Sequence, residues 1–321
     1  MRPELFTIGP FTLYSFGLMA ALALIVPAWV ASRDLRERGY EPGLAWEIIL
    51  GAGIGGFVGA RLDYLIQNGF EGGLFSSTGL VWYGGVIGGA LGVVIVTRLR
   101  RLPLGMVANV AAPGLALGYA IGRIGCQLSG DGDYGRPSSV PWAMSYPDGT
   151  VPTTEKVHPT PVYETLTMLV VFAVLWKLRH RLNNGWQLFG LWCVLQSVER
   201  FLVEFLRRND DVALGLTLPQ WVSIGIAAVG MVILILTRNG GTPSTAVAAV
   251  CAALVIGMAP AMLLDRHPDH GSAAGAIAMA TATDAPLPSS RPLDDHDLRD
   301  AHRPTPPPTA SAAPRRPSIP A

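Results

Sequence analysis

Residues 122–137, which read GRIGCQLSGDGDYGRP, place charged side chains and glycines at the end of a long apolar run. Arg123, Asp131, Asp133 and Arg136 all lie in this stretch. A charge at membrane depth costs about 2.5–3.5 kcal/mol even on the mildest insertion scale, so charges retained there usually serve a function. Glycine allows the backbone to come close to a ligand. We therefore expect a site of chemistry in this stretch.

Further polar residues lie at the ends of other apolar runs. They are Arg61 in GGFVGARLDY, Tyr83 in WYGGVIGG, His158, Tyr163 and Glu164 in VHPTPVYE, and Arg200 in SVERFLVEF. Guanidinium groups bind phosphate through paired hydrogen bonds, so Arg61, Arg123 and Arg200 on one level would suit an anionic ligand such as a phospholipid head group. A carboxylate, tyrosine or histidine beside them could act as a general acid or base. The residues thus predict recognition of a lipid phosphate and are compatible with group transfer.

Several of these residues also have simpler interpretations. Asp63 could equally form an ion pair at a helix end, and Tyr83 alone is more typical of an interfacial aromatic belt. Arg200, Glu204 and Arg208 are spaced for intrahelical pairs on an exposed helix end. The sequence lacks the GxSxG, HExxH and Walker motifs, which argues against serine hydrolases, zinc proteases and NTPases.

The composition is that of a membrane protein. Hydrophobic residues make up 50% of the chain and charged residues 15%, against about 25% charged residues in soluble domains. The net charge of +1 and the lack of a basic face give no reason to expect nucleic acid as a partner. The three cysteines have no metal-type spacing, so no disulfide framework, metal site or cofactor is predicted. The N-terminal residues lack the pattern of a removable signal peptide.

The apolar residues fall into blocks long enough to cross a bilayer as helices, because backbone polar groups in lipid must be paired within their own segment. We expect seven such spans, at residues 12–30, 44–66, 79–96, 104–125, 161–175, 186–206 and 216–236, and an eighth candidate at 244–264. The predicted fold class is therefore an all-α polytopic membrane protein, a bundle of seven or eight transmembrane helices. Residues 1–240 would form the helical domain, 241–266 an extra helix, and 267–321 a disordered tail rich in proline and alanine.

Basic residues follow alternate spans. They are concentrated after the first, third, fifth and seventh, at Arg33, Arg36, Arg38, Arg98, Arg100, Arg101, Lys177, Arg179, Arg181 and Arg238. The positive-inside rule places these loops in the cytoplasm and the N-terminus outside. Residues 126–160, with most of the polar stretch, would then face the outside.

Small residues line one face of the second span. Gly51, Gly55 and Gly59 recur every four residues, a pattern that favours close packing between transmembrane helices. Arg61 follows this glycine face directly, so we expect its side chain to be buried in the bundle.

Taken together, the polar segments resemble the signature of the bacterial prolipoprotein diacylglyceryl transferase family. GRIGCQLSGDGDYGRP is similar to that family's signature, approximately GRxGNFxNxExxGRP, and HPTPVYE resembles its HPxQLYE segment. Further matches are YSFGLM, GGFVGARLDY, WYGGVIGG, RFLVEFLR and LPQWVSIGIAAVG, so the resemblance runs in order over residues 9–238. Several motifs in the same order are far more specific than any one of them.

The resemblance implies an enzyme of the bacterial plasma (inner) membrane. It would transfer diacylglyceryl from phosphatidylglycerol to the lipobox cysteine at a prolipoprotein signal peptide, within the lipid bilayer, and release glycerol phosphate. Arg123 and Arg200 would hold the phosphate and its developing charge, with Tyr83 as a proton acceptor for the thiol and His158 as a further catalytic residue. The residues expected to bind substrate are Tyr14, Arg61, Asp131, Asp133, Gly135, Tyr163 and Glu164.

The sequence departs from the family pattern at three points. Tyr83 stands where the family usually has histidine, and a tyrosine with a pKa of about 10 is a poor base unless nearby cations lower that value. Cys126 replaces the signature asparagine and lacks its amide. The loop SGDGDYG is one residue longer, with Asp131 or Asp133 in place of a glutamate. These departures leave two alternatives open: a related transferase with another head group or acceptor, and a lipid-binding or transport protein without the chemistry.

Overall fold

The computed structural model describes residues 1–9, 11–67, 81–182 and 185–238, with the side chains of Phe11, Trp82 and Tyr83 left out. The candidate eighth span at 244–264 and the tail at 267–321 lie outside the described residues, so the expectations for them remain predictions. The division into segments 1–240, 241–266 and 267–321 likewise remains a prediction.

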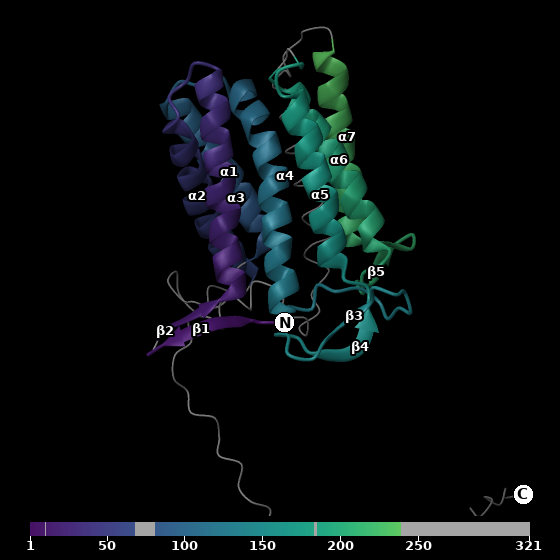
Figure 1. Cartoon of the computed structure of the whole chain (residues 1–321). Helices are drawn as coiled ribbons and strands as arrows, with labels where there is room; N and C mark the ends of the chain where they lie inside the picture. Colours follow the sequence, from purple (N-terminus) through teal and green to yellow (C-terminus); the bar gives the residue numbers. More distant parts are fainter. Residues whose placement is uncertain (10, 68–80, 183–184, 239–321) are drawn as a thin grey trace, which may run out of the picture. The chain divides into compact units, whose positions relative to one another are not determined.

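The described chain is mainly helical (Figure 1). Its helices are α1 (Ser15–Glu37), α2 (Leu44–Gln67), α3 (Trp82–Leu99), α4 (Leu104–Ser129), α5 (Thr160–Leu178), α6 (Gln187–Glu204) and α7 (Leu218–Thr237). Three short antiparallel hairpins, which the sequence did not predict, pair β1 (Glu4–Ile8) with β2 (Phe11–Tyr14), β3 (Met144–Tyr146) with β4 (Thr153–Val157), and β5 (Asp211–Ala213) with β6 (Leu216–Thr217). All three lie at one end of the helices, which we call the hairpin end; the opposite end, where α1, α3, α5 and α7 finish, is the basic end.

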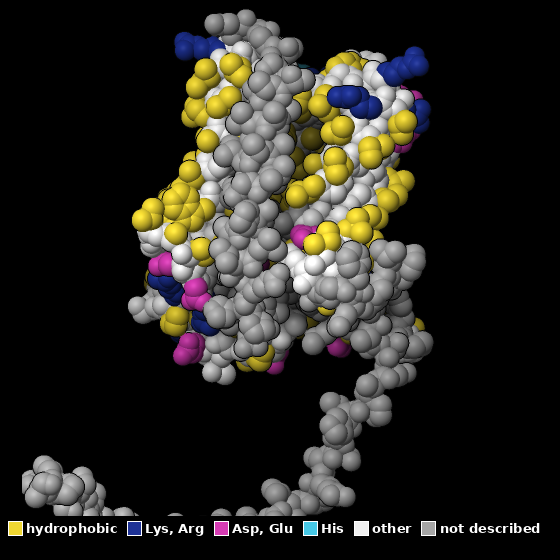
Figure 2. Space-filling model, turned by 180° about the vertical axis from the view of Figure 1, so that it is seen from behind, with side chains coloured by type: hydrophobic (Ala, Val, Ile, Leu, Met, Phe, Trp, Pro, Cys, Tyr) yellow, Lys and Arg dark blue, Asp and Glu magenta, His cyan; other side chains and the backbone are white. Residues whose placement is uncertain are grey.

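The helices carry the apolar surface of a polytopic membrane protein, as predicted. Five of them, α1, α2, α4, α5 and α7, are long and apolar enough to cross a membrane. The apolar part of α3 is shorter, Gly84–Leu99, and α6 contains Glu199, Arg200 and Glu204 within its 18 residues. Apolar side chains cover much of the visible flank of the helices; lysines and arginines lie at the basic end, and at the hairpin end they lie beside acidic side chains (Figure 2). Lipid is the solvent that suits such a flank.

The glycine face of α2 packs directly against glycines of α3, as the sequence predicted. A Cβ atom placed on Gly55 or Gly59 would overlap the backbone carbonyl of Gly88 or Gly84. Asp63, at the end of the same helix, accepts a hydrogen bond from the Gly84 N–H (2.9 Å) and so satisfies a free amide at the start of α3. Among the described residues Asp63 thus stabilises a helix end through hydrogen bonds from Gly84 and Gln67, and not through the ion pair that the sequence suggested. Arg61 is buried as expected.

This close approach predicts that Gly88→Ala destabilises the protein by about 1–3 kcal/mol, because the added methyl group forces α2 and α3 apart. Gly53→Ala on α2 is the matched control, since no atom lies within 4 Å of its added Cβ, and it should be neutral or stabilising by up to about 1 kcal/mol. Thermal unfolding in detergent measures both variants. Equal midpoints for the two would contradict the packing described here.

Helix α4 packs against α1 on one side and against α5 on the other (Figure 1). Fully buried small residues, Ala112, Ala116 and Ala120, allow close contact with Met168 and Leu175 of α5. This packing brings the last turns of α4, the first turn of α5 and the last turns of α6 together at the hairpin end.

Candidate functional site

A fully buried carboxylate, Glu164, lies at the start of α5 and pairs with three arginines. Arg123 from α4 reaches it through Nε. Arg200 and Arg207, from the end of α6 and just beyond it, place their Nη1 atoms 3.3 and 3.4 Å from its Oε1. Glu164 itself is 0% exposed, whereas the side chains of Arg123 and Arg200 are 15% and 20% exposed. The buried carboxylate therefore fixes the positions of these guanidinium groups, and part of the Arg123 and Arg200 side chains remains accessible to a ligand.

Two more carboxylates complete the set. Asp133 pairs with Arg123 and with Arg207, at 2.5 Å in the second case. Glu204 pairs with Arg200 at 3.0 Å, the i,i+4 spacing predicted from the sequence, and lies 3.8 Å from Arg207. We call these six side chains the arginine–carboxylate cluster: Arg123, Arg200, Arg207, Asp133, Glu164 and Glu204. Its formal charges cancel, which is how so many buried ions can be accommodated.

The loop after α4 carries Asp133 into the cluster. Gly130 ends the helix in the left-handed conformation (φ 59°) that favours glycine, and its N–H bonds to the Cys126 carbonyl at 2.9 Å. The chain then turns back, and Gly135 packs so tightly against the Leu206 carbonyl that a side chain would overlap it. The Arg136 N–H donates to the same carbonyl at 2.8 Å. These contacts explain why the stretch combines glycines with charges.

The two loop aspartates have opposite electrostatic environments. Burial alone would raise the pKa of Asp133, but the charges of Arg123 and Arg207 outweigh it and lower that pKa below its usual range. Asp131 is also buried and has no ion pair with an arginine among the described residues, so burial and the neighbouring Asp133 charge raise its pKa to about 6. Asp133 is thus held as an anion, whereas Asp131 titrates near neutral pH.

The raised pKa of Asp131 predicts a pH-dependent effect of Asp131→Asn on stability. Because the folded state disfavours the charged form, the wild type carries no penalty below its ordinary pKa of 3.8, and the penalty grows as the pH rises through about 6. At pH 8 it amounts to about 3 kcal/mol at most. The variant should therefore unfold at a higher temperature than the wild type at pH 8 and at nearly the same temperature at pH 4. A variant less stable at pH 8 would contradict this assignment.

Arg123 has two further neighbours on its own helix. Its Nη2 donates to the Tyr119 hydroxyl at 3.1 Å, and its Nη1 lies 3.7 Å from the Cys126 sulfur. Cys126, which stands where the family signature has asparagine, is therefore in direct contact with the signature arginine.

A second group of predicted residues lies beside this cluster rather than in it. The Tyr163 hydroxyl accepts a hydrogen bond from Trp142 Nε1 (2.7 Å) and lies 3.2 Å from His158 Nδ1. His158 also fixes the loop through its backbone, since its carbonyl accepts from the Gly135 N–H at 2.8 Å. These residues are held next to Glu164, one position from Tyr163 in the chain.

The structure brings together Arg123, Arg200, Asp133 and Glu164 from the set of predicted site residues. The third arginine of the cluster is Arg207 rather than Arg61, which is buried near Tyr64. Tyr14 ends β2, next to α1, and the side chain of Tyr83 lies outside the described residues. Glu204 and Arg207 were not among the predicted site residues, because this helix end was expected to be exposed; both are in fact buried. The sequence did contain one signal for them: the number of acidic residues near this end of the helices equals the number of arginines that would need a partner there.

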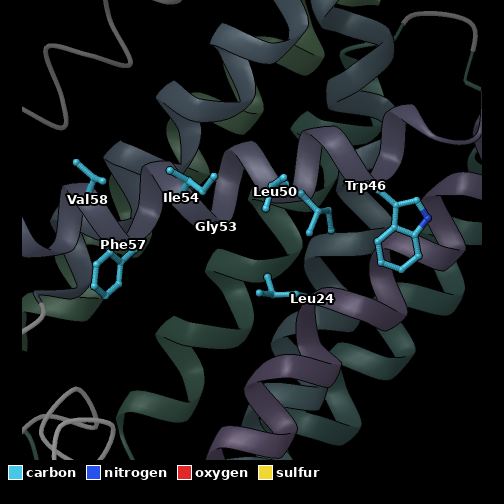
Figure 3. A pocket seen from close by; sticks show the side chains of 8 residues that line it. Leu24, Trp46, Leu50, Gly53, Ile54, Phe57 and Val58 are labelled. Atoms are coloured by element: carbon cyan, nitrogen blue, oxygen red, sulfur yellow. The ribbon is translucent and has the colours of Figure 1, made fainter. Parts of the chain in front are cut away.

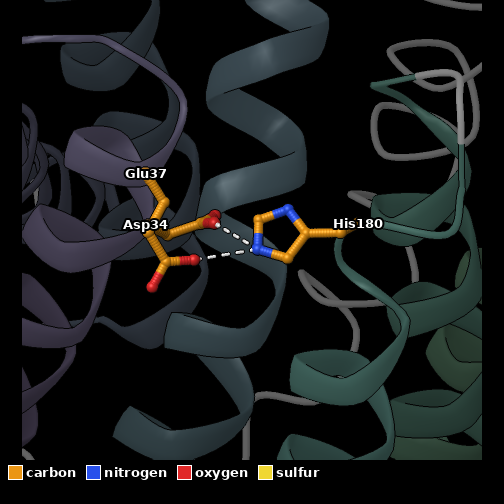
Figure 4. Close-up of side chains that lie close together, drawn as sticks. All are labelled: Asp34, Glu37 and His180. Atoms are coloured by element: carbon orange, nitrogen blue, oxygen red, sulfur yellow. Dashed lines mark hydrogen bonds and ion pairs between the residues drawn. The ribbon is translucent and has the colours of Figure 1, made fainter.

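Another polar group joins α1 to the end of α5 at the basic end (Figure 4). The buried Asp34 pairs with Arg38 at 3.0 Å and with Arg179 at 3.4 Å. His180 lies 2.9 Å from Glu37 and 3.9 Å from Asp34. The spacing of Asp34, Glu37 and His180 could hold a metal ion, as could that of Cys126, Asp131 and Asp133. In the first group Arg38 and Arg179 balance the carboxylate charge; in the second, Arg123 and Arg207 balance that of Asp133.

An open apolar pocket of about 500 Å³ lies between α1 and α2 (Figure 3). Its lining residues are Leu24, Trp46, Ile49, Leu50, Gly53, Ile54, Phe57 and Val58. This lining offers no charge, so it suits a hydrocarbon chain and not a reacting polar group.

Comparisons with known proteins agree with the motifs. Residues 3–236 match the family described as prolipoprotein diacylglyceryl transferase. Proteins named phosphatidylglycerol--prolipoprotein diacylglyceryl transferase are similar: one from Frankia alni is 36% identical over 74% of this chain and 66% of its own length. One from Chromohalobacter salexigens is 33% identical over 70% and 85%, and one from Dehalococcoides mccartyi 33% over 71% and 91%. The chain spans less than two thirds of the Frankia alni protein (66%) and of a further relative from Frankia casuarinae (61%).

Proposed function

We propose a reaction for this chain from the premise that it belongs to the prolipoprotein diacylglyceryl transferase family. The chain transfers the diacylglyceryl group of phosphatidylglycerol to the cysteine thiol of a prolipoprotein, at the signal peptide. The observation that carries this proposal is the arginine–carboxylate cluster, which presents two partly exposed guanidinium groups at the end of apolar helices. Lipid phosphate is the abundant anion at that depth.

The reaction forms a carbon–sulfur bond and breaks the bond between the diacylglyceryl carbon and a phosphate oxygen. Glycerol phosphate leaves with an additional negative charge, which Arg123 and Arg200 stabilise. Glu164 and Glu204 hold these arginines in place, so little reorganisation is needed when the charge develops. The carboxylates thus act as positioning residues.

The acceptor thiol must lose its proton, because the thiolate is the nucleophile. We retain Tyr83 as the proposed proton acceptor; it must act as the phenolate, a form that nearby positive charge favours. His158 is proposed to return a proton to the leaving phosphate. Residues proposed to contact substrate are Tyr14, Arg61, Asp131, Asp133, Gly135, Tyr163 and Glu164; of these, Asp133 and Glu164 contact the arginines directly.

We also propose that all seven described helices cross the bacterial plasma membrane, including α3 and the charged α6. The basic end faces the cytoplasm and the hairpin end, with the N-terminus, lies outside, where exported prolipoproteins arrive. The basic loops that follow α1, α3, α5 and α7 support this orientation, and Figure 2 shows lysines and arginines at that end. A reporter fused after Thr237 should signal from the cytoplasm; an external signal would reverse the orientation.

Incubation of the purified full-length protein with phosphatidylglycerol and a lipobox peptide tests the reaction. We expect a shift in peptide mass equal to one diacylglyceryl group, and no shift for a peptide with serine in place of the cysteine. Phosphatidylethanolamine as the sole lipid tests whether another head group serves. A folded protein that binds phosphatidylglycerol but modifies no peptide would favour the lipid-binding alternative.

A further inference from the structure

Helix α6 carries a buried carboxylate that the cluster does not use. Glu199 precedes Arg200 in the chain and is 6% exposed. Neither of its oxygens has a hydrogen-bond partner within the described part of the chain, and it forms none of the ion pairs that Glu164 and Glu204 make. A buried polar group without a partner costs about 1–3 kcal/mol, and more when charged. Such a group in a native protein calls for an explanation, of which a ligand is one.

A second unpaired acceptor lies on the same face of the helix. The buried Oε1 of Gln196 also lacks a hydrogen-bond partner among the described residues. Residues three apart on a helix are neighbours, about 5–6 Å between Cβ atoms. Gln196 is also four residues before Arg200, whose guanidinium belongs to the cluster. Two unpaired oxygen-bearing side chains therefore lie next to the proposed phosphate site.

Glu199 lines a pocket between α5 and α6. The pocket has a volume of about 230 Å³ and is also lined by Tyr163, Thr167, Leu202, Val203 and Leu206. It is smaller than the roughly 300–1,000 Å³ of pockets that enclose whole ligands, yet it exceeds several times the ~30 Å³ that one water molecule occupies in the liquid. Its size thus fits a small polar fragment and not a complete lipid.

The unpaired atoms define the fragment. Carboxylate and amide oxygens accept hydrogen bonds, so the ligand must donate at least two. An ammonium group or a hydroxyl group could donate, and the charges that act on Glu199, those of Glu164, Arg200, Arg123 and Arg207, are of both signs. Neighbouring hydroxyl groups donate without charge. Resting on the proposed function, we infer that Glu199 and Gln196 bind the free hydroxyls of the donor's glycerol head group, while Arg200 holds its phosphate.

The test compares phosphatidylglycerol with phosphatidylpropanol, which has the same charge and no free hydroxyl. The kcat/KM of the wild type should be at least about tenfold higher for phosphatidylglycerol than for phosphatidylpropanol. Each hydroxyl that phosphatidylpropanol lacks leaves a buried acceptor of Glu199 or Gln196 without a hydrogen bond. Glu199→Leu should remove most of this preference by raising KM for phosphatidylglycerol, with a less than about threefold change for phosphatidylpropanol. Ser197→Ala, a buried position on another face of α6, is the matched control and should keep the preference.

Two further variants separate this role from others. Glu199→Gln retains an acceptor oxygen and should keep the preference for phosphatidylglycerol. If it instead lost kcat at an unchanged KM, Glu199 would be a proton acceptor and the inference would be wrong. Gln196→Leu should weaken the preference in the same direction as Glu199→Leu. Thermal midpoints for all variants show whether they fold, and Glu199→Leu should not lower the midpoint, because the removed group has no partner.

A measurement of lipid binding tests this inference separately from the proposed reaction. If the wild type transfers from neither lipid, native mass spectrometry of the protein with both lipids still applies, and preferential retention of phosphatidylglycerol that Glu199→Leu loses would support the subsite alone. Equal retention, or equal transfer from the two lipids by an active wild type, would overturn it while leaving the transferase reaction intact.

Discussion

Arg123→Ala lowers kcat/KM for diacylglyceryl transfer by about 100- to 1,000-fold, the loss typical of removing one fixed donor that stabilises developing charge. Arg123 joins Glu164, Asp133 and Tyr119 through three different nitrogens. Because an ammonium group cannot reproduce this planar arrangement, Arg123→Lys should lose nearly as much. Initial rates of peptide modification at several phosphatidylglycerol concentrations measure both variants.

The control for this experiment is Arg98→Ala at the basic end. Arg98 is an exposed arginine near the end of α3 and should keep wild-type turnover, which shows that loss of one positive charge is not itself the cause. Full activity in Arg123→Ala, in protein with an unchanged thermal midpoint, would remove Arg123 from the reaction.

Glu164→Gln destabilises the protein by about 3–5 kcal/mol, because it leaves the buried arginine–carboxylate cluster with one uncompensated positive charge. At about 2–4 °C per kcal/mol, the value for domains of about 150–250 residues, the thermal midpoint should fall by roughly 6–20 °C. Transfer activity should fall as well, since Arg123 and Arg200 lose the carboxylate that positions them. Thermal unfolding followed by intrinsic fluorescence measures the first effect.

An exposed ion pair supplies the comparison. Glu47 pairs with Arg100 at the basic end, where the two side chains are 39% and 51% exposed. Glu47→Gln should therefore cost no more than about 1 kcal/mol. If Glu164→Gln were as mild as Glu47→Gln, the cluster would contribute little to the fold and its role in holding the arginines would be untenable.

The helices could be predicted from the sequence because each is an apolar block of bilayer length. Their observed ends lie within four residues of the predicted ones, except that α1 continues seven residues beyond its predicted end, to Glu37. α4 extends to Ser129, so the first half of the polar stretch is helical. The hairpins could not be predicted in the same way. β1 is exposed along its whole length and shows no alternation of buried and exposed residues, and the other strands have only two to five residues.

The candidate site was partly predictable for a related reason. Arg123, Glu164 and Arg200 stood out because their motifs lie inside or beside apolar blocks. Arg207 did not, because its burial depends on the loop after α4 folding back against the end of α6, through Gly135 and the Leu206 carbonyl. Contacts between segments so far apart in the chain leave no local pattern.

The most direct test follows both products of one reaction. Phosphatidylglycerol labelled differently in its diacylglyceryl and head-group portions is incubated with the full-length protein and a lipobox peptide. The account predicts a thioether-linked diacylglyceryl group on the cysteine, resistant to hydroxylamine, and an equal amount of released glycerol phosphate. Release of lysophospholipid with a hydroxylamine-sensitive acyl group on the peptide, or no labelled peptide at all, would contradict it.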